Sequence, residues 1–108
     1  ITIEIAQILI QIFEEKYGIN LQIKAPNDIY YNGKKVGGIL TESKIVGQKT
    51  KYIVVGIGIN TNSKNFGDDI KNIATSIKKE FNIEVDNLFI VNEFCKIFEK
   101  RLMKRIEE

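Results

Sequence analysis

The sequence predicts an α+β fold, with one antiparallel sheet that carries its helices on one face. Three observations lead to this fold class: apolar residues recur at helical spacing near the N-terminus, strand-like segments follow one another across tight turns, and two helix-like segments end the chain. Consecutive strands, rather than strands alternating with helices, favour an antiparallel sheet. The 108 residues, 44% of them hydrophobic and 28% charged, are enough for one domain with one core.

The N-terminal segment is predicted to be a helix over residues 2–17. Its apolar face is made of Ile3, Ala6, Ile10 and Phe13, widened by Ile8 and Leu9. Gly18 then occupies the position where a glycine commonly ends a helix. Beyond it, Leu21 and Ile23 indicate a short strand, which Pro26 ends because proline has no N–H to donate to a strand ladder.

The middle of the chain has the pattern of a β-hairpin followed by a longer strand. Asp28–Tyr31 and Lys34–Ser43 flank Asn32-Gly33, a pair typical of the type I′ turn, in which both central residues have positive φ. Gly47-Gln48-Lys49 indicates a second turn. The β-branched apolar run within Lys51–Asn60 predicts a central strand of an antiparallel meander.

The last part of the chain predicts a polar loop and two helices. Thr61–Asp69 is rich in turn-forming residues and is expected to be a surface loop. Asp69 is predicted to cap a helix that runs to about Phe81, and Asp86 to cap a longer helix over about residues 87–107. The apolar face of the last helix is made of Phe89, Ile90, Phe94, Ile97, Phe98 and Leu102.

Composition and charge exclude several classes of function. A formal net charge of +2, with acids and bases mixed along the chain, gives no reason to expect nucleic-acid binding by this segment. No apolar run approaches the roughly 20 residues of a membrane span, so no membrane contact is expected. The absence of histidine removes histidine-based metal sites and triads. The single cysteine, Cys95, indicates a reducing, cytoplasmic setting.

Glycines within two predicted strands allow two interpretations. Gly56-Ile57-Gly58 lacks the third glycine of a dinucleotide-binding turn and lies inside a strand rather than before a helix. Such glycines mark either a bulge or packing position, or the wall of a ligand site, and the two are about equally supported. Gly37-Gly38 raises the same question one strand earlier. If the two strands pair, their glycines form a flat floor that suits a ring-shaped ligand or close helix packing.

Polar residues beside these glycines are candidates for chemistry, and each also has a purely structural explanation. Lys34 and Lys35 face opposite sides of a strand, and two solvated lysines beside a turn are favoured over a lysine that points into a site. Asn27 and Asp28 suit a turn, but an amide beside a carboxylate could also bind hydrated Mg²⁺ or orient an attacking amine. Asn60, at a strand end, is by itself more typical of a turn than of a ligand contact.

Taken together, four segments resemble the biotin protein ligase family. The stretch 24–28 (KAPND), followed by 35–42 (KVGGILTE), is similar to the family's K-W-P-N-D and K-[LV]-[AG]-G-I-L-x-E patterns. The strand 55–60 is similar to V-x-G-I-G-I-N, and 74–77 (ATSI) resembles the A-T-S-L at the start of the following helix. Their order and spacing make the resemblance far more specific than any one motif, and it covers nearly the whole chain. It implies the class II aminoacyl-tRNA synthetase-like fold of the biotin ligase catalytic domain.

The resemblance implies an ATP-dependent ligase that works in two steps. Biotin and Mg·ATP give biotinyl-5′-AMP and pyrophosphate. A lysine of a biotin carboxyl carrier protein domain then attacks the mixed anhydride. The expected substrates are therefore ATP and biotin, the expected cofactor is Mg²⁺, and the expected partner is the carrier domain.

The resemblance also implies roles for individual residues. Lys35 matches the family's essential lysine, which contacts both the biotin carboxylate and the α-phosphate of the nucleotide. Asp28 is expected to orient or deprotonate the incoming lysine as the second catalytic residue, and Asn27 with Asp28 to hold Mg²⁺. Asn27 and Asn60 are expected at the nucleotide, and Thr61–Asp69 as a lid over the adenylate. The biotin pocket is expected to be lined by Gly37, Gly38, Gly56 and Gly58.

Departures from the family pattern lead to further expectations. Ala25 stands where the family has tryptophan, which affects packing beside the site. The family's arginine-rich G-R-G-R-x-G-R-x-W loop and its preceding strand have no counterpart, and the chain starts at Ile1 rather than Met. We expect residues 1–108 to be a single partial catalytic domain that lacks this loop and the small C-terminal barrel. It is expected to be inactive without the missing upstream half.

Alternative interpretations remain at this point. One is a non-catalytic module that binds biotin or the adenylate, and another is a related acyl ligase such as a lipoate ligase. The proline–asparagine–aspartate segment and the glycine strand favour biotin over lipoate. A homodimer formed through an exposed sheet edge is a further expectation, because dimers are common in the family and an open edge is a natural pairing surface.

Overall fold

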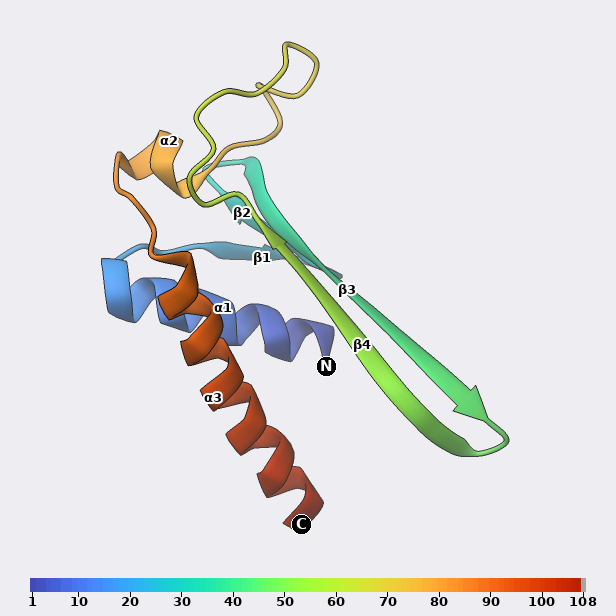
Figure 1. Cartoon of the computed structure of the whole chain (residues 1–108). Helices are drawn as coiled ribbons and strands as arrows, with labels where there is room; N and C mark the ends of the chain where they lie inside the picture. Colours follow the sequence, from blue (N-terminus) through green and yellow to red (C-terminus); the bar gives the residue numbers. More distant parts are fainter. Residues whose placement is uncertain (108) are drawn as a thin grey trace.

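The structure is a computed structural model that describes residues 1–107, and it has the expected α+β architecture (Figure 1). Four antiparallel strands form one sheet in the order β1-β2-β3-β4. The elements in chain order are α1 (Thr2–Tyr17), β1 (Gln22–Lys24), β2 (Asp28–Tyr31), β3 (Lys34–Val46), β4 (Lys49–Ile59), α2 (Ile77–Phe81) and α3 (Asn87–Glu107).

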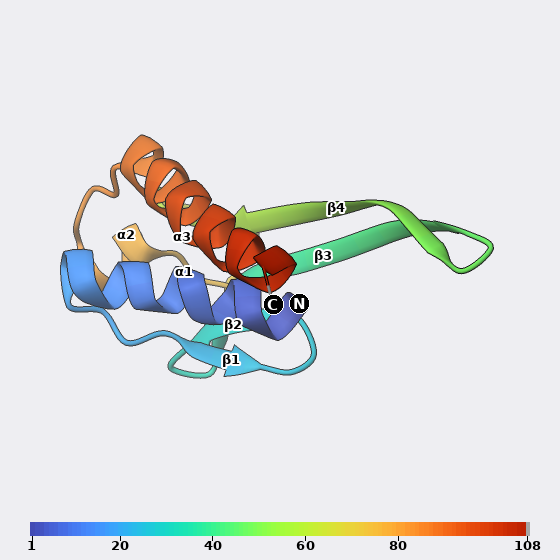
Figure 2. The same ribbon diagram turned by 90° about the horizontal axis from the view of Figure 1, so that it is seen from below.

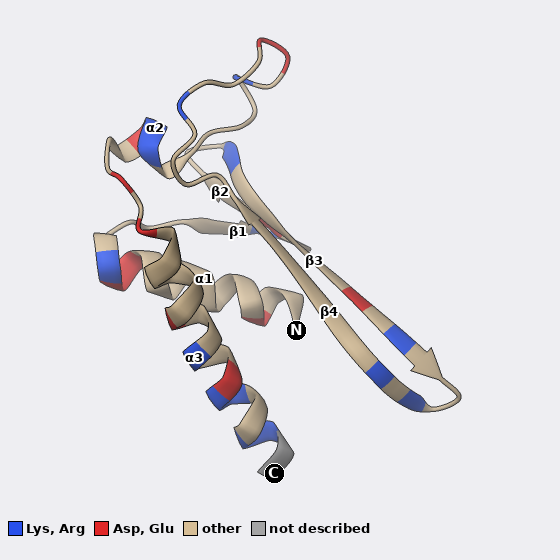
Figure 3. Ribbon diagram, viewed as in Figure 1, with Lys and Arg blue, Asp and Glu red and all other residues tan. Residues whose placement is uncertain are grey.

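The core lies between α1, the sheet and α3. α1 contacts β1, β3 and α3, and the far part of β3 and β4 extends beyond the helices as a two-stranded ribbon (Figures 1 and 2). The charged residues of this ribbon lie toward its far end (Figure 3). Ile3 of α1 is exposed, so the buried face of the helix is centred slightly away from the expected one. The buried α1 residues are Ile5, Ala6, Ile8, Leu9, Ile12 and Phe13.

The turns that the sequence predicted are confirmed by their backbone angles. Asn32 and Gly33 both have positive φ, 51° and 78°, as a type I′ hairpin turn requires. Gly47 opens the second turn with a φ of 63°. Gly18 ends α1 in the left-handed conformation, and its N–H donates to the carbonyl oxygen of Glu14. Local sequence therefore sets where these elements end.

β4 is an edge strand of the described sheet, and the prediction of a central strand was wrong. β3 pairs with β4 from Gly37↔Ile59 to Val46↔Lys49, while no described strand pairs with the other side of β4. About half of the surface of Ile53 and of Val54 is exposed. The prediction failed because an apolar run indicates that the faces of a strand can be covered. It does not indicate how many neighbouring strands pair with its two edges.

The helix predicted from Asp69 to Phe81 is also much shorter than expected, because α2 begins only at Ile77. Ser76 caps it in an extended conformation, with φ −136° and ψ 164°. Just before it, Ala74 forms a parallel bridge with Lys35 of β3. Backbone groups that bond to a strand cannot also bond within a helix, so this bridge delays the start of α2.

α3 begins where the sequence predicted, with the Asp86 Oδ1 accepting a hydrogen bond from the Phe89 N–H at 3.1 Å. The predicted apolar face is largely covered, although Leu102 near its end is exposed. α3 is joined to α1 by an ion pair between Arg105 and Glu4 and by the Asp86 N–H, which donates to the Tyr17 hydroxyl oxygen at 2.9 Å. Among the described residues, no helix has the length and apolarity to cross a membrane.

Candidate active site

Three glycines of β3 and β4 form the floor of a shallow depression with a volume of about 440 Å³. Gly38 lies opposite Gly58 in the antiparallel register, and Gly56 lies opposite Leu40. A Cβ atom added at Gly58 would meet nothing within 4 Å, and one at Gly56 would touch only Leu40. The floor without side chains that the sequence predicted is therefore present and open. The depression is lined by Asn27, Asp28, Lys35, Gly38, Ile39, Leu40, Gly56, Ile57 and Gly58.

Lys35 and Asp28 meet at the edge of this floor. The Lys35 Nζ lies 3.1 Å from the Asp28 Oδ1, and the two side chains are 48% and 26% exposed. A Cβ at Gly38 would lie 3.4 Å from the Oδ1 and 3.6 Å from the Nζ. An ion pair this exposed contributes little to stability. It does keep an ammonium group beside the glycine floor, where an anionic ligand can reach it.

A β-bulge explains why Lys35 lies on the same side of the sheet as Gly38. Residues three apart on a regular strand face opposite sides, and one extra residue reverses the alternation. Val36 is that extra residue, since the register of β2 on β3 runs Asp28↔Gly38, Ile29↔Gly37 and then Tyr30↔Lys35. The sequence indicates only that Lys34 and Lys35 face opposite sides, because the bulge depends on pairing with β2.

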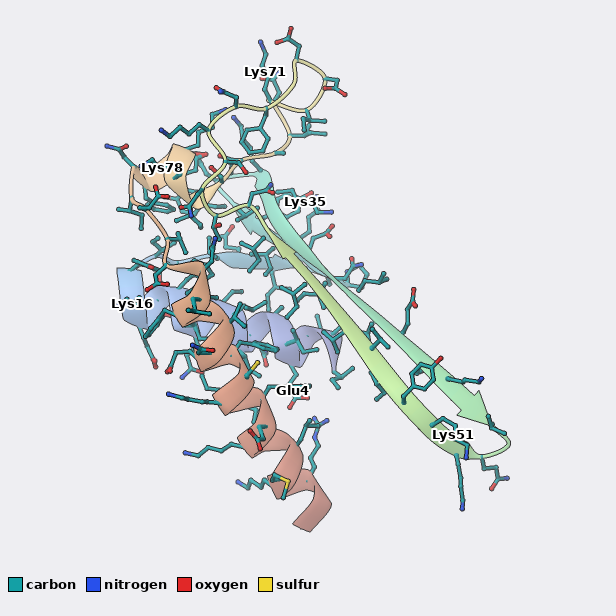
Figure 4. All side chains as sticks on the ribbon, in the orientation of Figure 1. Glu4, Lys16, Lys35, Lys51, Lys71 and Lys78 are labelled. Atoms are coloured by element: carbon teal, nitrogen blue, oxygen red, sulfur yellow. The ribbon has the colours of Figure 1, made fainter. Side chains whose placement is uncertain are left out.

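The backbone of Lys35 is held by the segment that returns from the loop after β4. Its N–H donates to the Ile73 carbonyl oxygen at 2.8 Å, and its own carbonyl oxygen accepts from the Thr75 N–H at 2.9 Å. In the labelled view, Lys35 lies at the end of β3 that adjoins this loop (Figure 4). The motif at 74–77 is visible in the sequence, but no local pattern indicates that it lies beside Lys35.

Gly37 and Asn60, two of the predicted site residues, do not line the depression. Gly37 is buried, and a Cβ there would collide with the carbonyl oxygen of Gly58, so the close approach of β3 and β4 requires glycine. The Asn60 N–H donates to the Val36 carbonyl oxygen at 2.8 Å, and its Nδ2 donates to the Thr75 carbonyl oxygen at 3.2 Å. Both residues have structural tasks, and their contacts with a ligand remain predictions.

The donor set for a metal at the depression is small. Asp28 is the one carboxylate that lines it, and its Oδ1 is already paired with Lys35. In the part of the chain that the structure describes, no three histidine, cysteine, aspartate or glutamate side chains group together to hold a metal ion. The remaining Asp28 oxygen and the Asn27 amide fit an Mg²⁺ that is bound mainly by phosphate oxygens and water.

The loop predicted to be a lid is polar and largely exposed, as expected. Thr61–Asp69 follows β4 directly, contains no helix or strand and lies at the same end of the sheet as Lys35 (Figure 4). Its function as a lid over a bound nucleotide remains a prediction.

Comparison with known proteins identifies the family. The model of the "Biotin/lipoate A/B protein ligase family" matches residues 3–60, a span that contains every predicted site residue. The chain belongs to this family. Among curated members, it is 39% identical over 103 residues to the "Bifunctional ligase/repressor BirA" of Bacillus subtilis (strain 168), which covers 94% of this chain and 32% of that protein. It is 34% identical over 98 residues to the human "Biotin--protein ligase", covering 87% of this chain and 13% of that protein.

Solved structures of biotin protein ligases from Aquifex aeolicus have the same fold as this chain. The apo structure superposes with a TM-score of 0.80 at 28% identity, over 99% of this chain and 47% of the Aquifex chain. The complex with biotin and ATP gives a TM-score of 0.78 at 29% identity, over 99% and 44%. These likenesses confirm the α+β fold and the resemblance to biotin protein ligases. The chain spans about a third or less of the two curated relatives and under half of the Aquifex ligase.

Proposed function

We propose that this chain is part of the catalytic domain of a biotin protein ligase, which forms biotinyl-5′-AMP and then transfers biotin to a lysine of a biotin carboxyl carrier protein. The observation that carries the proposal is the Lys35 ammonium beside an open glycine floor, 3.1 Å from Asp28. A compact ring system can lie on such a floor while its carboxylate reaches the ammonium. The ligase names of the relatives, and an Aquifex relative solved with biotin and ATP, support the same assignment.

In the proposed first step, a carboxylate oxygen of biotin attacks the α-phosphorus of ATP, and pyrophosphate leaves. Negative charge grows on the phosphate oxygens as the new bond forms. The Lys35 ammonium offsets this charge from a fixed position, which lowers the barrier because no reorganisation is needed during the reaction. Gly38, Gly56 and Gly58 allow the substrate to approach the sheet backbone, and Lys35 is not itself modified.

In the proposed second step, the amine of the carrier lysine attacks the carbonyl carbon of the anhydride, and AMP leaves. A free lysine has a pKa of about 10.4 and is mostly protonated at neutral pH. Asp28 orients this amine and accepts its proton. Asn27 and Asn60 contact the nucleotide, and Asn27 and Asp28 would help to hold an Mg²⁺ ion that offsets the charge of the phosphates. A cytoplasmic location is part of the proposal, in keeping with the single cysteine, Cys95.

We further propose that residues 1–108 form a partial catalytic domain that works together with the upstream half of the domain. The support is the free side of β4, where Tyr52, Ile53 and Val54 are each about half exposed. An open strand edge with apolar side chains is normally paired or covered in a stable protein. A second copy of the chain is the alternative occupant of this edge, and it would give a homodimer.

An adenylation assay tests the proposed function. The chain is incubated with biotin and labelled Mg·ATP, alone and with the upstream half of its own polypeptide, and biotinyl-AMP is measured. We expect product only when the upstream half is present. A substantial rate from the chain alone would contradict the proposed partial domain. Lipoyl-AMP formed in place of biotinyl-AMP would identify a lipoate ligase, and biotin binding without AMP transfer would identify a non-catalytic module.

The role of Asp28 is tested by separating the two steps. We expect Asp28→Asn to slow transfer from preformed biotinyl-AMP to a carrier domain by about 100-fold or more, because general base catalysis is lost. The rate of biotinyl-AMP formation is expected to fall much less. It is measured as pyrophosphate release in the absence of the carrier. Glu99→Gln, which changes an exposed carboxylate on α3 away from the depression, is the matched control. Equal losses in both steps would argue against a role of Asp28 in transfer.

A further inference from the structure

The loop after β4 is closed by hydrogen bonds between its two stems. Residues 60–63 follow β4 directly, and residues 75–78 include the cap and the first residues of α2. Because the bonds lie close together, the stems behave as one unit. The hydrogen bonds between the stems run from Asn60 Nδ2 to Thr75 O (3.2 Å), from Ile77 N to Asn60 O (3.1 Å), from Lys78 N to Thr61 O (2.8 Å), and from the Ser76 hydroxyl to Ser63 O.

Ser76 is central to this closure through its side chain. Its hydroxyl donates to the Ser63 carbonyl oxygen and accepts from the Lys79 N–H at 3.0 Å. The residue is fully buried, at 0% exposure. A side chain that caps a helix contributes to its stability, and this one also bonds to the first stem. Removal of this one hydroxyl would therefore break both bonds and loosen the stems.

The second stem is also the segment that holds Lys35. The Thr75 N–H donates to the Lys35 carbonyl oxygen at 2.9 Å, and two residues earlier the Ile73 carbonyl oxygen accepts from the Lys35 N–H at 2.8 Å. Both backbone polar groups of Lys35 thus depend on a segment that ends at Ser76. The side chain that carries the ammonium to the glycine floor starts from this point.

We propose that Ser76 is a positioning residue for Lys35. Its hydroxyl fixes the second stem of the loop, and that stem fixes the backbone of the lysine beside the glycine floor. As a statement about the reaction, this inference rests on the proposed function. It links order in the loop to the position of the ammonium, so a nucleotide that orders the loop also steadies Lys35.

Three variants separate this role from a general effect on folding. Ser76→Ala removes the hydroxyl, and Ser76→Thr keeps a hydroxyl and is expected to restore most of the lost function. Ser43→Ala, the same change at an exposed position far along β3, is the matched control. All are made in the form of the protein that produces biotinyl-AMP in the assay above.

The kinetic readout is a split between kcat and KM. With Ser76→Ala we expect kcat for biotinyl-AMP formation to fall about tenfold, because the Lys35 ammonium would then occupy its reactive position for a smaller fraction of the time. The KM for biotin is expected to change less than about twofold, because the glycine floor is untouched. An unchanged kcat, or a loss seen only in KM, would overturn the proposal.

The structural readout is amide hydrogen exchange, which does not depend on activity. Ser76→Ala is expected to speed exchange at the Lys35 and Thr75 amides, while amides in the middle of α1 keep their protection. Unchanged exchange at Lys35 would overturn the proposal. If the wild-type protein forms no biotinyl-AMP, the proposed function fails, and exchange at Lys35 still decides whether the link exists. If Ser76→Ala exposes α1 as well, Ser76→Cys, with its weaker S–H donor, replaces it and is judged by the same outcomes.

Discussion

Replacing Lys35 by alanine is expected to lower the rate of biotinyl-AMP formation by about 10²–10³-fold, the usual cost of removing one fixed group that stabilises charge in a transition state. The ammonium lies beside the glycine floor and is the one cationic side chain among the residues that line the depression. Without it, charge on the α-phosphate must be stabilised by mobile water. Single-turnover adenylation, with biotin and Mg·ATP saturating, measures the effect on this step directly.

Lys34→Ala is the matched control for this experiment. Lys34 is the adjacent lysine on β3, has the same charge and chain length, and does not line the depression. Its removal is expected to change adenylation less than about twofold, as for an ordinary surface substitution. If both variants lose activity equally, the effect would come from the net positive charge at this end of the sheet, and Lys35 would not have the proposed role.

Gly37→Ala is expected to destabilise the chain by about 3 kcal/mol, toward the upper end of what overpacking of a core costs. A Cβ at Gly37 would collide with the carbonyl oxygen of Gly58 on the neighbouring strand. A backbone atom within a paired strand cannot rotate away as the end of a side chain can, so β3 and β4 must separate locally. The loss would be a large part of the roughly 5–15 kcal/mol of a typical domain. Urea unfolding followed by circular dichroism measures it.

Gly58→Ala, on the opposing strand, is the matched comparison. A Cβ there would meet nothing within 4 Å and would point into the depression. We expect stability to change by less than about 0.5 kcal/mol, as at an open surface position. The KM for biotin should instead rise, because the methyl group occupies the floor. A Gly37→Ala variant as stable as the wild type would contradict the packing role of Gly37. A Gly58→Ala variant with an unchanged KM for biotin would contradict the binding role of Gly58.

Much of the fold was predictable because it depends on residues close together in the chain. Helical spacing in α1, the glycine after it, and the Asn32-Gly33 turn are local patterns, and each is found where it was expected. Asp86 likewise caps α3 as predicted. The start of α2 was not predictable in this way, since it depends on the bridge between Ala74 and Lys35.

The candidate site was predictable in its residue types but only partly in its geometry. Six of the eight predicted residues line one depression. Gly37 instead allows the close approach of β3 and β4, and Asn60 forms hydrogen bonds with the protein backbone. The roles proposed for Lys35 and Asp28 rest on the family motifs rather than on the residues alone, because a lysine beside a turn is ordinarily solvated.

The sequence by itself determined the α+β class, the turns, the family and the set of candidate site residues. Each of these depends on neighbouring residues or on motifs in a fixed order along the chain. Only the tertiary structure decided that a bulge at Val36 brings Lys35 to the side of Gly38, and that the returning loop holds its backbone. These features arise from pairing between segments far apart in the chain. No local pattern specifies them, because they form only when the sheet assembles.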